Sequence, residues 1–216
     1  GLARPGQIFT ASSTGALLIA PGAMFHDTHK LAEYTFTDAV RYSSNIVMGK
    51  LGLLVGSERL YRYSTALGFG SLTGVSFPGE SAGKLRSPGH WSARSCPTIA
   101  IGHELSVTAL QLALAYGAIA NGGVLMEPML LREVRDAEGG VRRTVSPRAA
   151  GRVFAPATAQ VLRAMLSAVV DSGTAKTARV PGIRIAGKTG TAQKYDAAIG
   201  TYGKGMYLSS FAGFVP

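Results

Sequence analysis

Apolar and polar positions in the first 34 residues follow neither a helical nor a strand period over any length. The turn pairs Pro5-Gly6 and Pro21-Gly22 and the polar cluster 12–15 divide this part into short pieces, because glycine and proline favour turns. We therefore expect loops and brief strands over residues 1–34.

Three consecutive helices are expected from Thr37 onward. The first has Thr37 as its N-cap and ends near 43–45, where serine and asparagine side chains compete for backbone hydrogen bonds. The second covers about 46–55, and the third 57–68, each ending at a glycine. Residues 43–45 are thus predicted to form a corner between two helices, where side chains are held rigidly and remain exposed to a cleft.

Two more helices and a hairpin are predicted in the second half of the chain. Thr108 and Gln111 have the spacing of a capping box, and small apolar residues follow at helical spacing. Residues 129–145 indicate a hairpin that turns at 138–140, and an amphipathic helix covers about 156–170. The apolar stripes expected to face the core are Leu110, Ala113, Leu114, Gly117 and Ala118 on the first helix and Leu162, Met165, Leu166 and Val169 on the second.

The stretch 183–194 alternates isoleucine with polar or small residues, which predicts a strand with one apolar face. It carries Lys188-Thr189-Gly190-Thr191, in which an ammonium, two hydroxyls and bare backbone N–H groups suit an anionic ligand. Glycines at 187 and 190 mark places where another group approaches the backbone closely. By itself the quartet fits an edge strand with a protective lysine better than a binding site. A polar loop (195–205) and a last apolar strand (206–215) are expected to follow.

A second motif far upstream changes that interpretation. Ser43-Ser44-Asn45 fits an S-x-N element, and Lys188-Thr189-Gly190-Thr191 fits a K-T-G element. Together with an S-x-x-K serine, these elements are the signature of penicillin-binding proteins and class A β-lactamases. In this order they resemble the penicillin-binding transpeptidase domain. Further segments resemble class B members of the division or elongation type: 58–63, 67–70, 77–83, 106–112 and 120–123.

The resemblance covers essentially the whole chain and implies an α+β fold, an antiparallel sheet flanked by helices. We expect residues 1–216 to form a partial transpeptidase domain, a single-domain fragment truncated at both ends. The family's S-x-x-K helix would lie upstream of Gly1, and a further strand and a covering helix would follow Pro216. The chain is therefore expected to be inactive alone, because the nucleophile would be absent.

The resemblance also implies a reaction. In the family, a serine attacks the penultimate carbonyl of a D-Ala-D-Ala stem peptide, D-alanine leaves, and an amine of a neighbouring strand resolves the acyl-enzyme. Carried over to this chain, Ser43 would relay a proton to or from the leaving amine. Asn45 would hold the substrate amide, and Lys188 would supply positive charge.

Substrate binding would fall to the strand that carries Lys188. The hydroxyls of Thr189 and Thr191 would bind the terminal carboxylate, with Gly190 between them. The backbone N–H of Thr191 would be one of two oxyanion donors. β-Lactams would occupy the same pocket and acylate the same serine.

Composition narrows the remaining possibilities. With 46% hydrophobic and 16% charged residues, the chain is globular, with enough length for a real core. No apolar run is long enough to span a membrane. The net charge is +10, but the basic residues are scattered without interleaved aromatics, so no nucleic-acid binding is expected. The single Cys96 excludes an intrachain disulfide.

Three further short patterns resemble functional motifs but do not meet the requirements of those motifs. His26-Asp27-Thr28-His29 suggests a metal, but no third ligand follows at a recognisable spacing. A similar family segment leads into the S-x-N helices, which favours a structural role, and we expect no metal or other cofactor. Ser81-Ala82-Gly83-Lys84 is the chain's S-x-x-K, but nearby proline and glycines oppose the helix that this chemistry needs. A phosphate-binding loop is excluded by its spacing.

The expected partners are D-Ala-D-Ala stem peptides of peptidoglycan, β-lactam antibiotics and, through regions outside this chain, a membrane-embedded glycan-polymerising protein. The expected location is the bacterial inner membrane, with this domain facing the periplasm or cell exterior. Two alternatives stay open. One is a D,D-carboxypeptidase or β-lactamase on the same scaffold, against which the quartet with Thr191 argues. The other is a non-catalytic β-lactam-binding or scaffold module, which a missing upstream serine would favour.

Overall fold

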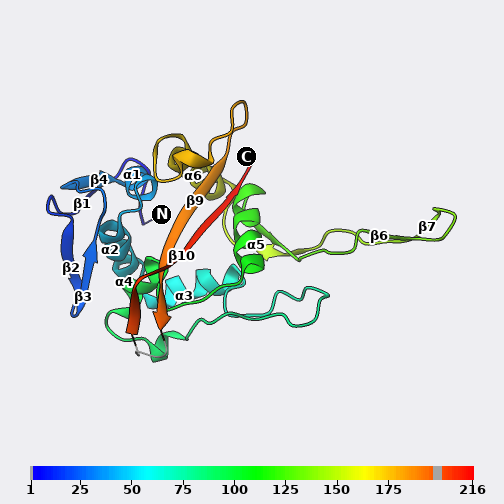
Figure 1. Ribbon diagram of the computed structural model, residues 1–216, viewed down its shortest axis with the longest axis horizontal. Helices are drawn as coiled ribbons and strands as arrows, with labels where there is room; N and C mark the ends of the chain where they lie inside the picture. The colour runs from blue at the N-terminus through cyan, green and yellow to red at the C-terminus, as the bar shows by residue number, and fades with distance from the viewer. Residues whose placement is uncertain (1, 197–200) are drawn as a thin grey trace.

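The computed structural model describes residues 2–196 and 201–216, and its helices and strands agree with the predicted α+β class (Figure 1). The strands are β1 (Ile8–Thr10), β2 (Ala16–Ala20), β3 (Ala23–His26), β4 (Glu33–Thr35), β5 (Val124–Met126), β6 (Glu133–Arg135), β7 (Val141–Thr144), β8 (Ala149–Arg152), β9 (Ala186–Asp196) and β10 (Thr201–Phe214). The α-helices are α1 (Phe36–Arg41), α2 (Asn45–Val55), α3 (Ser57–Ala66), α4 (Ser95–Ala100), α5 (Ala109–Ala120) and α6 (Pro156–Ser172). The 3-10 turns are η1 (Pro88–His90) and η2 (Lys176–Ala178).

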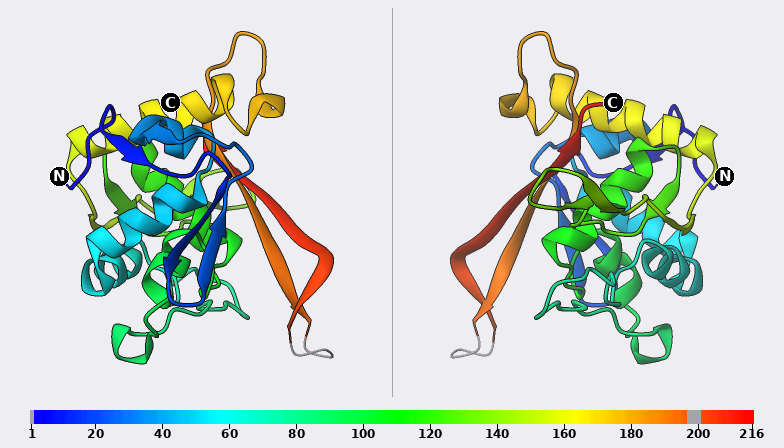
Figure 2. Two further views of the ribbon diagram at one scale, coloured as in Figure 1. Left: turned by 90° about the vertical axis from the view of Figure 1, so that its left-hand side faces the viewer. Right: turned by 90° about the vertical axis from the view of Figure 1, so that its right-hand side faces the viewer.

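All strand pairs in this part of the chain are antiparallel, and each forms its own two-stranded sheet. The pair β9–β10 lies at the centre, with α6 packed on β9, α5 packed on β10, and the two helices in contact with each other. On the other side, α2 packs on α4 and on the β2–β3 hairpin. Figure 2 shows β9 and β10 extending beyond this body at one end.

Small buried clusters hold the layers together. Tyr34, Ala39, Val47 and Leu51 join β4, α1 and α2, and Ile46 of α2 packs against the β2–β3 hairpin. Glycine lets α2 approach α4 closely, since a Cβ on Gly52 would lie 2.6 Å from the Cβ of Ala100. The corner at 43–45 is therefore anchored on both sides by packed α2 and α1.

The predicted starts of two elements are wrong by a few residues. The N-cap of α1 is Thr35 and not Thr37: the Thr35 hydroxyl accepts from the Asp38 N–H at 3.0 Å, while the Thr37 hydroxyl donates to the Pro5 carbonyl. The strand that carries the K-T-G element begins at Ala186 and not at Ile183. Ile183 instead bonds back to Val180, closing a tight turn.

Helix α5 has the predicted capping box between Thr108 and Gln111, but its buried face differs from the predicted stripe. Of the predicted positions, Ala118 is buried and Leu110 and Leu114 are partly buried, but Ala113 and Gly117 are exposed. Gln111 and Ala115 are buried instead. The helix is rotated because the Gln111 amide reaches three backbone carbonyls of neighbouring loops. Its Nε2 donates at 2.8 Å, 2.9 Å and 3.1 Å to the carbonyls of Ser71, Ala82 and Gly68.

The other predicted elements have mixed outcomes. The brief strands of the first 34 residues, the turn at 138–140 and helices α2, α3 and α6 are confirmed, and the predicted inward face of α6 is buried or partly buried. The loop expected at 195–205 is wrong at both ends, because β9 continues to Asp196 and β10 starts at Thr201. Residues 197–200 lie outside the described part. Within the described residues, no helix combines the length and apolar character needed to cross a membrane.

Candidate active site

All six residues predicted for the site line one pocket of about 700 Å³. Ser43 and Asn45 reach it from the corner between α1 and α2, and Lys188–Thr191 reach it from β9. The structure therefore brings together two motifs that are remote in sequence. Other residues in the wall include Thr28, Tyr42, Met48, Ile101, His103 and Thr174.

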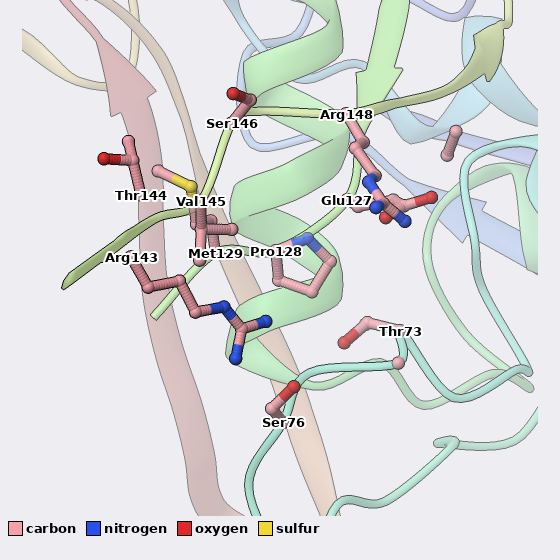
Figure 3. A pocket seen from close by; sticks show the side chains of 12 residues that line it. Thr73, Ser76, Glu127, Pro128, Met129, Arg143, Thr144, Val145, Ser146 and Arg148 are labelled. Atoms are coloured by element: carbon pink, nitrogen blue, oxygen red, sulfur yellow. The ribbon is translucent and has the colours of Figure 1, made fainter. Parts of the chain in front are cut away.

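A somewhat larger pocket, of about 800 Å³, lies elsewhere, between the loop 73–76 and the strands near β6 and β7 (Figure 3). It contains none of the S-x-N or K-T-G residues. We place the candidate chemistry in the smaller pocket, because only there do a hydroxyl, an amide, an ammonium and strand N–H groups converge.

The S-x-N corner has an unusual backbone. Ser43 is exposed and has φ +58°, a left-handed conformation that costs a residue with a Cβ about 1–2 kcal/mol. Two hydrogen bonds from the end of α1 fix it, from the Ser43 N–H to the Val40 carbonyl and from the Ser44 N–H to the Ala39 carbonyl. Such strain persists where the surroundings determine the backbone, which is common at functional sites.

Ser44 and Asp27 fix this corner through buried hydrogen bonds. Ser44 is the N-cap of α2, accepting from the Val47 N–H at 3.1 Å, and its hydroxyl donates to Asp27 Oδ2 at 2.6 Å. The other Asp27 oxygen accepts from the Ile46 N–H at 3.1 Å. Since both residues are buried, these charge-assisted bonds act without competition from water.

Asn45 is fixed through the same segment. Its Nδ2 donates to the His26 carbonyl at 2.9 Å, while Asn45 also lines the pocket. The stretch 26–29, which could have suggested a metal site, thus has a structural role: Asp27 uses both carboxylate oxygens on α2, and His29 stacks on Tyr42 with ring centroids 4.3 Å apart.

On β9, burial lowers the pKa of Lys188 below its ordinary value of 10.5. Its Nζ donates to the Thr189 carbonyl at 3.1 Å. Gly187 and Gly190 allow the close approach that was predicted, but the approaching group is the partner strand: a Cβ at 187 would lie 2.5 Å from the Phe211 ring, and one at 190 would lie 2.6 Å from the Ser210 hydroxyl.

Thr174 is a site residue that the sequence reading missed. Its hydroxyl lies 2.9 Å from the Thr189 hydroxyl, and it lines the pocket. Gly173 permits this position, because a Cβ there would lie 2.3 Å from the Arg41 carbonyl, to which Thr174 also bonds. In the sequence it is a hydroxyl residue after a glycine that follows a helix, a pattern that indicates only a turn. His103 and Tyr42, also in the wall, carried no signal of their own.

The S-x-x-K segment 81–84 is not helical, as predicted. Residues 81–83 have no regular structure, Gly83 has φ +65°, and Lys84 forms an isolated bridge with Ser106. The Ser81 hydroxyl accepts from the Gly83 N–H. Without a helix, serine and lysine do not share a face, so this pair lacks the arrangement of an activated nucleophile.

Comparisons with known proteins agree with this geometry. A profile of the penicillin binding protein transpeptidase domain matches residues 19–216, and the chain belongs to this family. It is 38% identical over 195 residues to penicillin-binding protein PbpB of Mycolicibacterium smegmatis, covering 87% of this chain and 30% of the relative. It is 36% identical to stage V sporulation protein D of Bacillus subtilis, covering 84% of this chain and 28% of that protein. The class B resemblance drawn from the sequence is confirmed.

Solved structures give the same result. Penicillin-binding protein 3 of Mycobacterium tuberculosis, complexed with aztreonam, matches with a TM-score of 0.90 and 36% identity over 100% of this chain and 49% of that one. The transpeptidase domain of Burkholderia pseudomallei penicillin-binding protein 3 matches with a TM-score of 0.86 and 34% identity, covering 99% of this chain and 61% of that one. The chain thus spans less than a third of the two curated relatives named above.

Proposed function

We propose that the full-length protein is a serine-type D,D-transpeptidase that cross-links peptidoglycan. The observation that carries this proposal is the meeting of Ser43, Asn45 and Lys188–Thr191 in one pocket, in a chain of the transpeptidase family. Relatives such as FtsI of Caulobacter vibrioides, 34% identical over 194 residues, are named probable peptidoglycan D,D-transpeptidases.

The proposed reaction has two halves. A serine outside residues 1–216 attacks the penultimate carbonyl of the stem peptide, giving an ester and releasing D-alanine. The amine of a second strand then attacks the ester, forming the new amide and returning the serine hydroxyl. Ser43 passes the proton to the leaving D-alanine nitrogen, and Asn45 holds the substrate amide.

The strand β9 recognises the charged end of the substrate. The hydroxyls of Thr189 and Thr191 donate hydrogen bonds to the terminal carboxylate and orient it, with the Lys188 charge nearby. The Thr191 N–H stabilises the oxyanion, a contribution of about 3 kcal/mol where such donors have been removed. Thr174, bonded to Thr189, holds that hydroxyl in place.

β-Lactams are proposed to acylate the same serine, because their strained cyclic amide and the neighbouring anionic group imitate the D-Ala-D-Ala end. The related penicillin-binding protein 3 of Mycobacterium tuberculosis has been crystallised with aztreonam and with ampicillin. We further propose that the protein is anchored in the bacterial inner membrane, faces outward, and works with a membrane-embedded glycan-polymerising protein.

A fluorescent penicillin tests this function on the full-length protein. One labelled serine outside residues 1–216 is expected, with at least about 100-fold slower acylation in Lys188→Ala and Ser43→Ala. Lys84→Ala, which removes the exposed lysine of the S-x-x-K segment 81–84, is the matched control and should label normally. Normal labelling of both site variants would overturn the site assignment.

The product then distinguishes transfer from hydrolysis. With a stem peptide and an acceptor amine, a cross-linked product supports the transpeptidase. Free tetrapeptide as the only product would instead show a carboxypeptidase, rapid turnover of the penicillin a β-lactamase, and no reaction at all a binding module.

The 216-residue chain alone is expected not to label. Ser81 lacks a helix and Ser43 lacks a lysine three residues later on the same helical face, so neither is an activated nucleophile. Stable labelling of any serine within this chain, located by peptide mapping, would show that the nucleophile has been misplaced.

A further inference from the structure

A long two-stranded projection leaves the body of the molecule at residues 124–152, here called the β-arm. Strands β5 and β8 pair at its root, and β6 and β7 pair near its tip. Between them, the Glu127 N–H bonds to the Arg148 carbonyl at 2.9 Å and the Val145 N–H to the Arg132 carbonyl at 2.8 Å. Figure 1 shows the outer half of the β-arm reaching far from the helices.

The outer half has little support from the rest of the protein. The main contacts of β6 and β7 in the described structure are with each other, and all four residues of β7 are exposed. An isolated two-stranded hairpin is at best marginally stable in water. The outer half also leaves apolar side chains in contact with water. Leu130 is 65% and Val141 52% accessible, and Met129, Leu131 and Val134 are also exposed.

The charges on the β-arm are unevenly paired. Near the tip, Arg135 pairs with Glu133 and Arg142 pairs with Asp136. Arg132, Arg143 and Arg148 form no ion pair within the described residues. The β-arm therefore carries three arginines whose charge is not used in ion pairs among the described residues.

Arg143 on β7 and Arg148, just before β8, line the pocket of about 800 Å³ between the β-arm and the loop 73–76, here called the arm groove. In Figure 3, Arg143 and Arg148 extend into it from the β-arm, Thr73 and Ser76 lie across from them, and Glu127 also lines it. The far wall is braced, since Glu80 Oε1 accepts from the Thr73 N–H at 2.6 Å. Next to Ser76, Phe77 is 68% accessible.

We propose that the arm groove and the free edge of β7 bind an extended, acidic segment of a partner protein. Each strand of a two-stranded sheet has one edge with unpaired backbone groups. A peptide can bind along such an edge as an additional strand. Its carboxylates would bind Arg143 and Arg148, and its apolar side chains would cover Met129 and Phe77. Arginine and exposed apolar groups together are typical of protein interfaces.

The observations favour a peptide over an anionic membrane or polymer. Glu127 lies in the groove, and Asp136 and Glu138 lie at the tip, so a uniformly negative surface would meet repulsion along the β-arm. A peptide can instead place its carboxylates at the two arginines alone. Complementary charges of this kind set specificity and register.

A random peptide library displayed on phage tests the proposal, selected on the full-length protein. Recovered sequences should alternate acidic with β-branched or aromatic residues. A synthetic peptide from the selection should bind at least ten-fold more weakly to Arg143→Glu/Arg148→Glu, and N-methylation of alternate backbone amides should abolish binding. Arg59→Glu/Arg62→Glu, with the same charge change on α3, is the matched control and should bind normally.

Several results would overturn the proposal. They are a selection without acidic enrichment, peptides that bind the arm and control variants equally, or tight binding of the N-methylated peptide. Sedimentation with phosphatidylserine vesicles or with purified peptidoglycan that requires Arg143 and Arg148 would assign the surface to those polymers or membranes. Self-association that the arm variant removes, seen by sedimentation velocity, would assign it to a second copy of this chain.

Discussion

Asp27 shows how one buried residue fixes a site from a distance. Its carboxylate bonds Ser44 and the start of α2, while the flanking His26 carbonyl holds Asn45. Ser43 lies between these anchors with its hydroxyl exposed and its backbone at φ +58°. The orientation of the proposed proton relay thus depends on a residue that does not face the pocket.

Asp27→Ala is expected to destabilise the full-length protein by about 3 kcal/mol, because it leaves buried donors without an acceptor. Acylation by penicillin should slow even at temperatures where the variant is folded. Asp27→Asn keeps one acceptor oxygen and should recover part of both losses. Urea unfolding and labelling rates measure this, with exposed Asp171→Ala as control. Unchanged labelling in folded Asp27→Ala would show that the segment only supports folding.

Lys188 links stability to pH. Burial lowers its pKa from 10.5, so between the folded and unfolded pKa values the unfolded chain binds a proton that the folded chain has lost. The free energy of unfolding therefore rises with pH in that window, and the cost of the buried charge is fully present below the folded pKa.

Lys188→Met removes this contribution. In this variant we expect the free energy of unfolding to rise less with pH between the lowered pKa and 10.5. Stability at pH 7 should not fall. Acylation should be slower by about 100-fold. Urea titrations at several pH values measure the slope. An identical pH slope in the two proteins would contradict the assigned burial of the ammonium.

At the scale of elements, α5 shows how a polar residue sets a helix's orientation. Gln111 is fully buried, and its amide joins the loops at Gly68, Ser71 and Ala82 while capping its own helix. An apolar pattern alone predicted the stripe that includes Ala113, which is exposed. Satisfying the buried Gln111 amide outweighs burying one methyl group.

Gln111→Leu is expected to lower the free energy of unfolding by about 3 kcal/mol, because three loop carbonyls lose their shared, fully buried donor. Gln160→Leu on α6, an exposed position, makes the same chemical change and should stay within about 0.5 kcal/mol of the parent. Chemical denaturation of the full-length protein compares them. Equal losses would indicate that the Gln111 network contributes little.

At the scale of the whole molecule, β10 exposes apolar side chains. Tyr207 is 53% and Leu208 61% accessible, and Met206 and Phe211 are also exposed. Large exposed apolar surfaces favour association.

The isolated 216-residue chain should therefore self-associate or bind a hydrophobic dye such as ANS. Sedimentation velocity and dye fluorescence measure this, with Leu208→Glu/Phe211→Glu expected to reduce the association. A monomer with a sharp cooperative melt above about 60 °C, beyond the usual mesophile range, would contradict this expectation.

Local sequence determined much of the secondary structure. The capping box at Thr108 and Gln111, the helix between 45 and 55 and the turn at 138–140 follow from interactions within a few residues, and these are what periodicity and capping signals report. The motif residues of the site were also readable, because their types and order match a known signature.

Only the tertiary structure decided which residues meet. The contacts of Ser44 with Asp27, of Thr174 with Thr189, and of the S-x-N corner with β9 in one pocket join segments remote in sequence. The buried face of α5 and the start of β9 at Ala186 were likewise settled by neighbours. The reason is physical: local patterns fix backbone preference, whereas burial and buried hydrogen bonds depend on what packs against each segment.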